Sequence, residues 1–345
     1  MPVNRVSMVS LGKSSIQIVP VALGTWSWGD SGGWEFGKTH TEKDLAEIVS
    51  VAVAAGPNIL FDTAEGYGGG ASEEYLGRFL RESDAKAVIA TKFSPRRFEI
   101  RRRDLFNALR GSIRRLGIAQ VDLYQIHWPT RFASIESRMA PLADAVEEGL
   151  VRAVGVCNFS LDQIRRSHDA LARRGIPLAT VQLEYSLVHR KPELEGVLRA
   201  CVDREITLLA YSPLAMGMLT GKYSPGRQPP PPRAARYPSA FFSRIEPLIR
   251  LMKEIGRRHN DKSLAQVALN WVCCKGAVPI AGAKTKLQAG ENLGAMGWRL
   301  SNKDVELLDA TSMDLWPYSM RPSTNSAFAN LREKLRCHRA MLASV

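Results

Sequence analysis

Eight strand-like runs recur along the 345-residue chain, and most of the intervals between them are long enough for a helix. The runs are apolar and rich in β-branched residues without strict alternation, which is typical of parallel strands covered on both faces. They occupy residues 21–26, 58–62, 87–92, 121–127, 151–158, 179–185, 206–212 and 277–282. Several intervening helical stretches end in glycine, a common helix stop. The order predicts repeated β-α units.

Eight such units in a chain of this length predict a (β/α)8 TIM barrel, whose active site lies at the C-terminal ends of the strands. A doubly wound sheet is the rival fold, and the lack of a G-x-G-x-x-G turn after the first strand weakens it. Residues 1–24 predict two short strands around a turn, an N-terminal β-hairpin. We expect one domain over residues 1–345, with a core of about 9–312 and a C-terminal tail of 313–345.

Charge and cysteines narrow the class of protein. The net charge is +13, but the basic residues are spread over several helices, so a solvated surface that attracts an anionic ligand fits better than a nucleic-acid binder. Five cysteines with no C-x-x-C pair predict reduced thiols inside the cell and no metal site. No membrane span or signal peptide can be drawn. We expect a cytoplasmic monomer or weak oligomer, with a plastid or other organelle left open.

Polar residues end six successive strands. They are Asp62, Lys92, His127, Asn158, Gln182 and the pair Tyr211-Ser212. Each alone could be a helix cap, a snorkelling lysine, a satisfied core histidine or a turn residue. In a barrel, however, all six would face one mouth, and packing alone does not explain such a series. The sequence therefore predicts a functional site at these strand ends.

Tyr67 follows one of these strand ends inside a glycine cluster, and its expected neighbours indicate proton chemistry. A phenol has a pKa near 10, and a cation such as Lys92 would favour its ionised form. Asp62 on the adjacent strand would keep a partly buried Lys92 charged, and His127 could hydrogen-bond a substrate oxygen. The set suits hydrogen transfer at a carbonyl. Because no side chain supplies a hydride, a cofactor is implied.

Two segments could hold the phosphates of that cofactor. The eighth strand ends at Gly282 and turns into a helix that begins with lysines, where backbone N–H groups and basic side chains can meet an anion. Residues 213–238, here called the strap, follow the seventh strand and precede the next clear helical pattern. A connection of this length is usually functional or disordered. We expect the strap to cover a pyrophosphate, although the part from 225 to 238 could be a Pro-rich insert without that role.

The sequence resembles the aldo-keto reductase superfamily. The motifs "GTWSWG", "FDTAEGYGGGASEEYLG", "DLYQIHWP", "VRAVGVCNFS", "YSPLAMGMLTGKY" and "IAGAKTKLQAGENLGAMGW" stand in the family order over about residues 9–312. The resemblance implies a barrel that binds NADPH and reduces an aldehyde or ketone to an alcohol. It also implies a catalytic tetrad of Asp62, Lys92, His127 and Tyr67, with Tyr67 as general acid. Within the superfamily, the sequence looks most like plastid-type reductases of plants and algae, which include pyridoxal reductases.

The resemblance also implies the contacts of the cofactor, from its nicotinamide to its adenosine end. They are Thr25, Trp26, Asp62, Asn158, Gln182, Tyr211, Ser212, Leu214, Gly221, Lys222, Gly282, Lys284, Gln288, Glu291 and Asn292. Two positions depart from the family. Cys157 stands where many members have serine, and Gln288 stands where classical reductases have an arginine for the 2′-phosphate. Lys284, Lys222 or an arginine of the strap would then balance that phosphate in NADPH.

The expected substrate contacts are Tyr67, His127, Trp128 and Trp28, and Trp34 and Trp316 could add apolar surface. A different class of function is a redox-sensing regulatory subunit similar to the potassium-channel β subunits, which share the fold. The full tetrad favours turnover over sensing. A third interpretation is a basic scaffold or nucleic-acid-binding protein that retains a barrel without catalysis.

Overall fold

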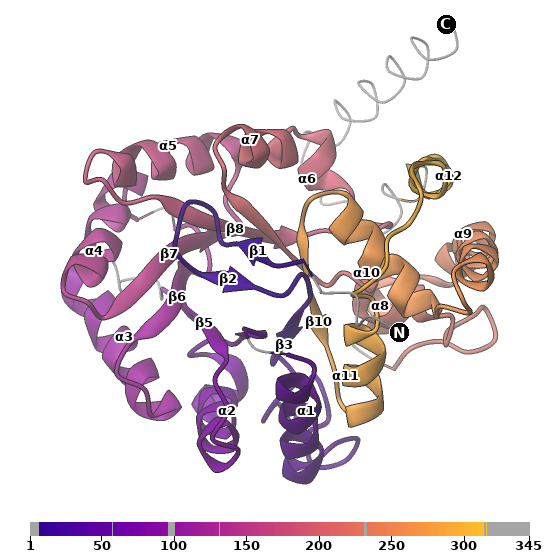
Figure 1. Cartoon of the computed structure of the whole chain (residues 1–345), viewed down its shortest axis with the longest axis horizontal. Helices are drawn as coiled ribbons and strands as arrows, with labels where there is room; N and C mark the ends of the chain where they lie inside the picture. The colour runs from indigo at the N-terminus through magenta and orange to yellow at the C-terminus, as the bar shows by residue number, and fades with distance from the viewer. Residues whose placement is uncertain are drawn as a thin grey trace, which may run out of the picture.

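Eight parallel strands close into a barrel in a computed structural model that describes residues 7–56, 58–95, 101–130, 132–230, 233–313 and 315. The strands follow one another around the barrel in the order β10-β3-β4-β5-β6-β7-β8-β9, with helices outside them (Figure 1). Their bounds are β3 Ala22–Gly24, β4 Leu60–Asp62, β5 Val88–Phe93, β6 Val121–Ile126, β7 Val151–Cys157, β8 Leu178–Glu184, β9 Thr207–Tyr211 and β10 Val278–Gly282. The predicted (β/α)8 barrel is confirmed.

The helices follow the predicted stretches with two differences. Their bounds are α1 Glu42–Ala54, α2 Ala71–Glu82, α3 Arg102–Leu116, α4 Ile135–Glu147, α5 Leu161–Ala172, α6 Lys191–Leu194, α7 Val197–Asp203, α8 Arg233–Arg236, α9 Ser239–Arg258, α10 Leu264–Cys274, α11 Lys286–Leu293 and α12 Asn302–Ser312. The stretch after β8, expected as one helix, is divided at Gly196, which has φ +76°. The strap contains the 3-10 segment η2 (Ala215–Thr220) and α8, so it is more ordered than its composition indicated.

The N-terminal hairpin, β1 (Val9–Ser10) and β2 (Gln17–Ile18), covers one end of the barrel, as Figure 1 shows. Its apolar side chains Leu11, Ile16 and Ile18 are buried against the residues that point into the barrel. Thr207, the first residue of β9, accepts a hydrogen bond from the Gly12 N–H at 2.8 Å. Because the hairpin covers the end where the strands begin, we expect a ligand to enter where the strands end.

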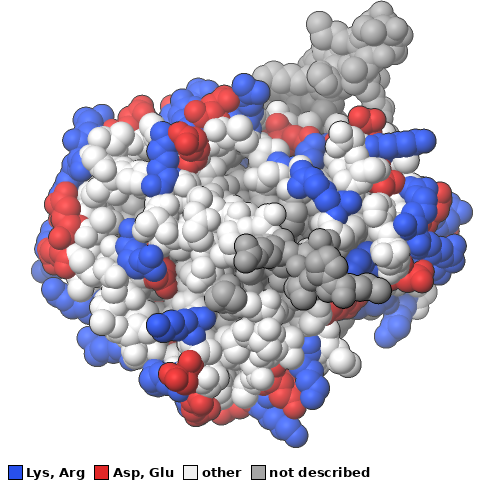
Figure 2. All heavy atoms as spheres, viewed as in Figure 1, with Lys and Arg blue, Asp and Glu red and all other residues white. Residues whose placement is uncertain are grey.

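In Figure 2, the charged side chains lie mostly over the helices at the rim of the face that carries the hairpin, and most of the described surface nearer the centre is uncharged. Among the described residues, no helix is long and apolar enough to cross a membrane. That part of the chain also contains no group of three or more His, Cys, Asp or Glu side chains that could hold a metal ion.

Helices α2 and α3 pack at backbone contact because Gly77 has no side chain. A Cβ atom at this position would lie 2.2 Å from the Leu116 carbonyl oxygen, which belongs to the last residue of α3. Backbone atoms at that distance cannot give way as the end of a flexible side chain can, so a substitution would push the helices apart. The contact fixes α2, which begins directly after the 3-10 segment that contains Tyr67.

We expect Gly77→Ala to lower the free energy of unfolding by about 2 kcal/mol, the cost of overpacking a tight contact. The matched control is Gly290→Ala in α11, where the nearest atom to a new Cβ lies 3.9 Å away. There the better helix propensity of alanine should raise stability by up to about 1 kcal/mol. Urea unfolding measures both, and equal effects of the two substitutions would contradict the packing described.

Candidate active site

The four residues of the predicted tetrad come from three neighbouring strand ends. Asp62 ends β4, Lys92 lies near the end of β5 and His127 follows β6 directly. Tyr67 begins the 3-10 segment η1 (Tyr67–Gly70), five residues after Asp62. The barrel register pairs Asp62 with Ala90, two residues before Lys92, so the side chains of adjacent strands meet at the same end. The structure therefore brings the four residues together.

The ammonium group of Lys92 is fully buried and paired with a carboxylate. Its Nζ lies 2.5 Å from Asp62 Oδ1 and also donates to the Thr63 carbonyl oxygen at 2.8 Å. The second oxygen of Asp62 accepts a hydrogen bond from Gln182 Nε2 at 2.8 Å. Burial by itself would lower the pKa of Lys92, but its interactions with nearby groups, above all the charge of Asp62, outweigh burial and raise it. Lys92 is therefore a permanent cation at neutral pH.

The Tyr67 hydroxyl lies 3.4 Å from Lys92 Nζ, at the long end of hydrogen-bond distance. The expected effect of Lys92, which favours the ionised phenol, is present, but burial of the ring outweighs it. Burial raises the pKa of Tyr67 to about 12, and the opposing effect of Lys92 is smaller. The phenol is therefore protonated at neutral pH, with a cation beside its oxygen. A protonated phenol next to a cation can donate its hydrogen to a substrate oxygen.

His127 stands beside Tyr67, with 5.8 Å between the ring centroids. Burial, helped by the charge of Lys92, lowers the pKa of His127 to about 3, so its ring is neutral at neutral pH. The backbone of His127 is fixed on both sides. Its N–H donates to the Phe93 carbonyl at 2.8 Å, and its carbonyl accepts from Asn158 Nδ2 at 3.0 Å. The ring can act as a neutral hydrogen-bonding group towards a substrate.

Asn158 links the tetrad to the next strands. Its side-chain oxygen accepts a hydrogen bond from the Tyr211 hydroxyl at 2.9 Å, while its amide nitrogen donates to His127. Asn158 adopts φ +63°, a left-handed conformation that asparagine tolerates better than most residues. Cys157, which precedes it on β7, is buried, and burial raises the pKa of its thiol. The polar strand ends thus form one hydrogen-bonded series.

A cavity of about 830 Å³ opens at these strand ends. Most of the predicted cofactor and substrate residues line it, namely Trp26, Asp62, Tyr67, His127, Trp128, Asn158, Gln182, Tyr211, Ser212, Leu214, Lys222, Gly282, Lys284, Gln288, Glu291 and Asn292. Thr25 and Gly221 do not line it. Thr25 is buried and donates to the Asp62 carbonyl at 3.1 Å, which steadies the strand end, and Gly221 ends η2 with φ +74°.

The tryptophans are arranged differently from the prediction. Trp28 is 1% exposed and packs near Phe61 in the core, so it does not line the cavity. Trp26, which precedes it by two residues, does line the cavity and is 46% exposed. A single turn of loop decides which indole faces solvent, and the sequence pattern does not encode that orientation. Trp34 lines the cavity too, whereas Trp316 and the residues from 316 onwards lie outside the described part of the chain.

Three basic side chains, Lys222, Arg233 and Lys284, line the cavity together. Arg233 and Lys284 lie over the Trp34 ring, 5.4 Å and 5.5 Å from its centroid, and Lys222 lies over Tyr223. Burial and the charge of Arg233 lower the pKa values of both lysines. Within the described part of the chain, the buried Nε of Arg233 has no hydrogen-bond partner. The sequence predicted that an arginine of the strap could contribute here, but it did not identify which one. The path of the loop decides which arginine faces the cavity.

The strap is tied to the barrel rim by an ion pair that the sequence did not reveal. Arg236 of α8 pairs with Glu184, the last residue of β8, and both residues line the cavity. Glu184 stands two positions after Gln182, so strand alternation places both side chains on the same face. On the other side of the cavity, Lys284 Nζ donates to the Trp34 carbonyl at 2.6 Å and to Thr39 Oγ1 at 2.9 Å. Polar contacts of Arg236 and Lys284 therefore hold the loops that border the cavity.

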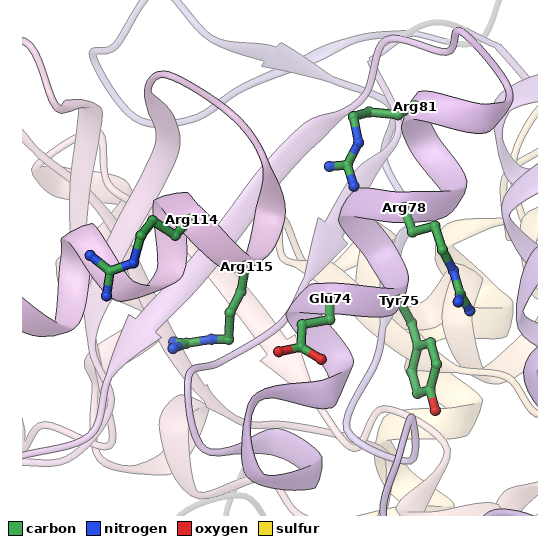
Figure 3. A pocket seen from close by; sticks show the side chains of 6 residues that line it. All are labelled: Glu74, Tyr75, Arg78, Arg81, Arg114 and Arg115. Atoms are coloured by element: carbon green, nitrogen blue, oxygen red, sulfur yellow. The ribbon is translucent and has the colours of Figure 1, made fainter.

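A smaller hollow of about 390 Å³ lies outside the barrel between α2 and α3 (Figure 3). Its lining is Glu74, Tyr75, Arg78, Arg81, Arg114 and Arg115. Two of these arginines are neutralised, because Arg115 pairs with the buried Glu73 and Arg78 pairs with Glu42. Figure 3 also shows the side chains of Arg78 and Arg114 pointing in opposite directions. We conclude that the cavity at the strand ends, which contains the tetrad, is the candidate active site.

A barrel that places a carboxylate, a lysine, a phenol and an imidazole beside an elongated cavity belongs to the class of (β/α)8 oxidoreductases. The comparisons agree with this class. The Aldo/keto reductase family model matches residues 20–312, and the chain belongs to this family. The expected resemblance is thereby confirmed.

Individual relatives extend over most of the chain. The chain is 36% identical to the chloroplastic pyridoxal reductase of Arabidopsis thaliana over 336 residues, 94% of this chain and 88% of that protein. It is 34% identical to an NADP(+) aldo-keto reductase of Schizosaccharomyces pombe, over 71% of this chain and 76% of that protein. The solved glycerol dehydrogenase of Gluconobacter oxydans has a TM-score of 0.77 at 26% identity, covering 94% of this chain and all of that structure.

Two buried histidines should make the fold less stable in mild acid. Burial lowers the pKa of His127 to about 3 and that of His189 to about 4, whereas an unfolded histidine titrates near 6.5. The unfolded chain therefore binds more protons between these values, so this contribution is complete above about pH 6.5 and decreases as pH falls towards 4. Urea unfolding at about pH 7 and about pH 5 measures the loss. We expect a smaller loss in His127→Gln, and an equal loss would show that His127 is not buried in neutral form.

Proposed function

We propose that this protein reduces an aldehyde or ketone to an alcohol with NADPH, with Tyr67 as the general acid. The supporting observation is the buried Asp62–Lys92 pair, with Lys92 Nζ 3.4 Å from the Tyr67 oxygen. Bound NADPH supplies a hydride to the carbonyl carbon, and the charge that develops on the carbonyl oxygen needs a proton. Tyr67 donates that proton, and Lys92 stabilises the phenolate that remains. His127 donates a hydrogen bond that orients the carbonyl oxygen.

The residues of the cavity fit a dinucleotide with phosphates. The volume of about 830 Å³ is within the range of cofactor sites, and the polar strand ends Asn158 and Gln182 offer amide groups to a nicotinamide. Lys222, Arg233 and Lys284 converge in the cavity, and none of the three pairs with a carboxylate in the part of the chain that the structure describes. The unpartnered Arg233 Nε is a donor that an anion would satisfy. We infer that this cluster receives the phosphates, including the 2′-phosphate that distinguishes NADPH from NADH.

The substrate would enter between two half-exposed indoles. Trp26 is 46% exposed with its ring centroid 6.5 Å from that of Tyr67, and Trp128 is 53% exposed and stacked on His127 at 5.9 Å. These rings flank the two groups that would contact the carbonyl oxygen. Large exposed apolar surfaces beside a polar centre favour a flat, uncharged carbonyl compound. The name of the Arabidopsis relative, a pyridoxal reductase, is consistent with an aromatic aldehyde.

The regulatory-subunit alternative receives no support from the comparisons, because the relatives reported above are named as reductases or dehydrogenases. The same names disfavour a scaffold without catalysis. A cytoplasmic location, with a plastid or other organelle left open, stays a prediction. So do the single domain over residues 1–345 and the monomeric or weakly oligomeric state.

Replacing Tyr67 by phenylalanine removes the proposed proton donor and leaves the ring in place. We expect carbonyl reduction to fall by at least ~100-fold, the scale of losing a proton-transfer group. NADPH binding, followed by quenching of protein fluorescence, should persist because the phenol oxygen is not among the phosphate-binding groups. The assay is NADPH oxidation with a panel of aldehydes that includes pyridoxal. Undiminished turnover by the variant would refute the role of Tyr67.

Replacing Arg233 by alanine tests the choice of cofactor. A charge-assisted contact contributes about 1.5–3 kcal/mol, so NADPH should bind ~10- to 100-fold more weakly, while NADH affinity should change little. Arg250→Ala serves as the control because Arg250 lies on α9 with 73% of its side chain exposed. Fluorescence titration with both cofactors gives the affinities. Equal weakening for NADPH and NADH would place Arg233 away from the 2′-phosphate.

A further inference from the structure

A serine outside the tetrad contacts the ring of His127. Ser94 follows β5 and stands two positions after Lys92, and its Oγ lies 2.8 Å from His127 Nδ1. The Ser94 N–H donates to Glu65 Oε1 at 2.6 Å, so the backbone that carries the hydroxyl is itself held. With Nδ1 engaged, Nε2 is the ring nitrogen available to the cavity, which His127 lines. Ser94 therefore contacts Nδ1, the ring nitrogen that would not hydrogen-bond to the substrate.

The contact can select one tautomer of the ring. A neutral imidazole carries one N–H, and a serine hydroxyl can either donate to a bare Nδ1 or accept from a protonated one. His127 Nδ1 is the acceptor that the structure provides for the Ser94 hydroxyl, and no second side-chain or backbone acceptor is found for it among the described residues. A partly buried hydroxyl is satisfied when it donates its hydrogen. This arrangement favours a hydroxyl hydrogen that points to Nδ1 and a ring proton on Nε2.

We propose that Ser94 is a positioning residue that holds His127 with Nε2 protonated, so that the ring donates a hydrogen bond to the carbonyl oxygen of the substrate. The inference rests on the proposed carbonyl reduction. In the other tautomer, Nε2 would present a lone pair to the lone pairs of the carbonyl oxygen, and the contact would be repulsive. Ser94 would therefore affect catalysis without touching the substrate.

The backbone contacts of His127 make this role separable from folding. The N–H and carbonyl of His127 are bound by Phe93 and Asn158, so the main chain stays fixed when the serine hydroxyl is removed. The rotation and tautomer of the ring then depend on the stacked Trp128 and on Ser94. Stacking restrains the plane of the ring but does not choose which nitrogen carries the proton. The hydrogen bond with Ser94 is the contact that can select the tautomer.

The direct test is NMR of the full-length chain labelled with ¹⁵N-histidine, without cofactor, at about pH 7. Comparison with His127→Gln identifies the two ring nitrogens of His127, whose chemical shifts report which one is protonated. We expect a bare Nδ1 and a protonated Nε2 in the wild type and in Ser94→Thr, which keeps the hydroxyl, and a mixture of tautomers in Ser94→Ala. A protonated Nδ1 in the wild type, or an unchanged spectrum in Ser94→Ala, would overturn the proposal.

Kinetics supply the second readout. Ser94→Ala should lower kcat by ~10-fold, the effect of weakening one hydrogen bond, and leave NADPH affinity unchanged. Ser94→Thr should retain most of the activity. The control is Ser186→Ala, because the buried Ser186 hydroxyl has no hydrogen-bond partner among the described residues, so its loss removes no bond seen in the structure. A lower kcat with an unchanged tautomer would reject the role of Ser94. A changed tautomer in a protein that reduces no carbonyl would reject the proposed function instead.

Discussion

The ion pair between Lys92 and Asp62 is the interaction on which the site depends. An ammonium group with no exposed surface would lose its proton or destabilise the barrel if it lacked a partner. Asp62 supplies the compensating charge at 2.5 Å, and Gln182, from the far side of the barrel, satisfies the second carboxylate oxygen. A closed barrel makes this possible because it joins residues 120 positions apart. The result is a fixed positive charge under a phenol.

Burial and the charge of Lys92 together set the protonation states of Tyr67 and His127. The phenol of Tyr67 stays protonated because burial outweighs the lysine, whereas the imidazole of His127 stays neutral because burial and the lysine act in the same direction. Both groups can then donate hydrogen bonds to one oxygen without a second positive charge in the site. The hairpin covers the opposite end of the barrel, so under the proposed function a substrate and a cofactor would share the cavity at the strand ends.

The barrel and the positions of the tetrad could be predicted because they depend on strand order. Polar residues at successive parallel strand ends must meet, whatever the loops do, and Asp62, Lys92 and His127 do so. Loop side chains were harder to predict, since the burial of Trp28 and the pairing of Arg236 with Glu184 depend on local bends that carry no periodic signal. The opposing effect of burial on the pKa of Tyr67 could not be read from the sequence, because it depends on how deeply the ring lies in the fold.

The charge of Lys92 is the most direct test of this account. NMR titration of the ¹⁵N-lysine-labelled chain, with Lys92→Met to identify the signal, follows the protonation of its Nζ. The account predicts an ammonium that remains protonated above the usual lysine pKa of about 10.4 and that titrates lower in Asp62→Asn. A wild-type Lys92 that loses its proton below about pH 9, or one that is indifferent to the loss of the Asp62 charge, would contradict it.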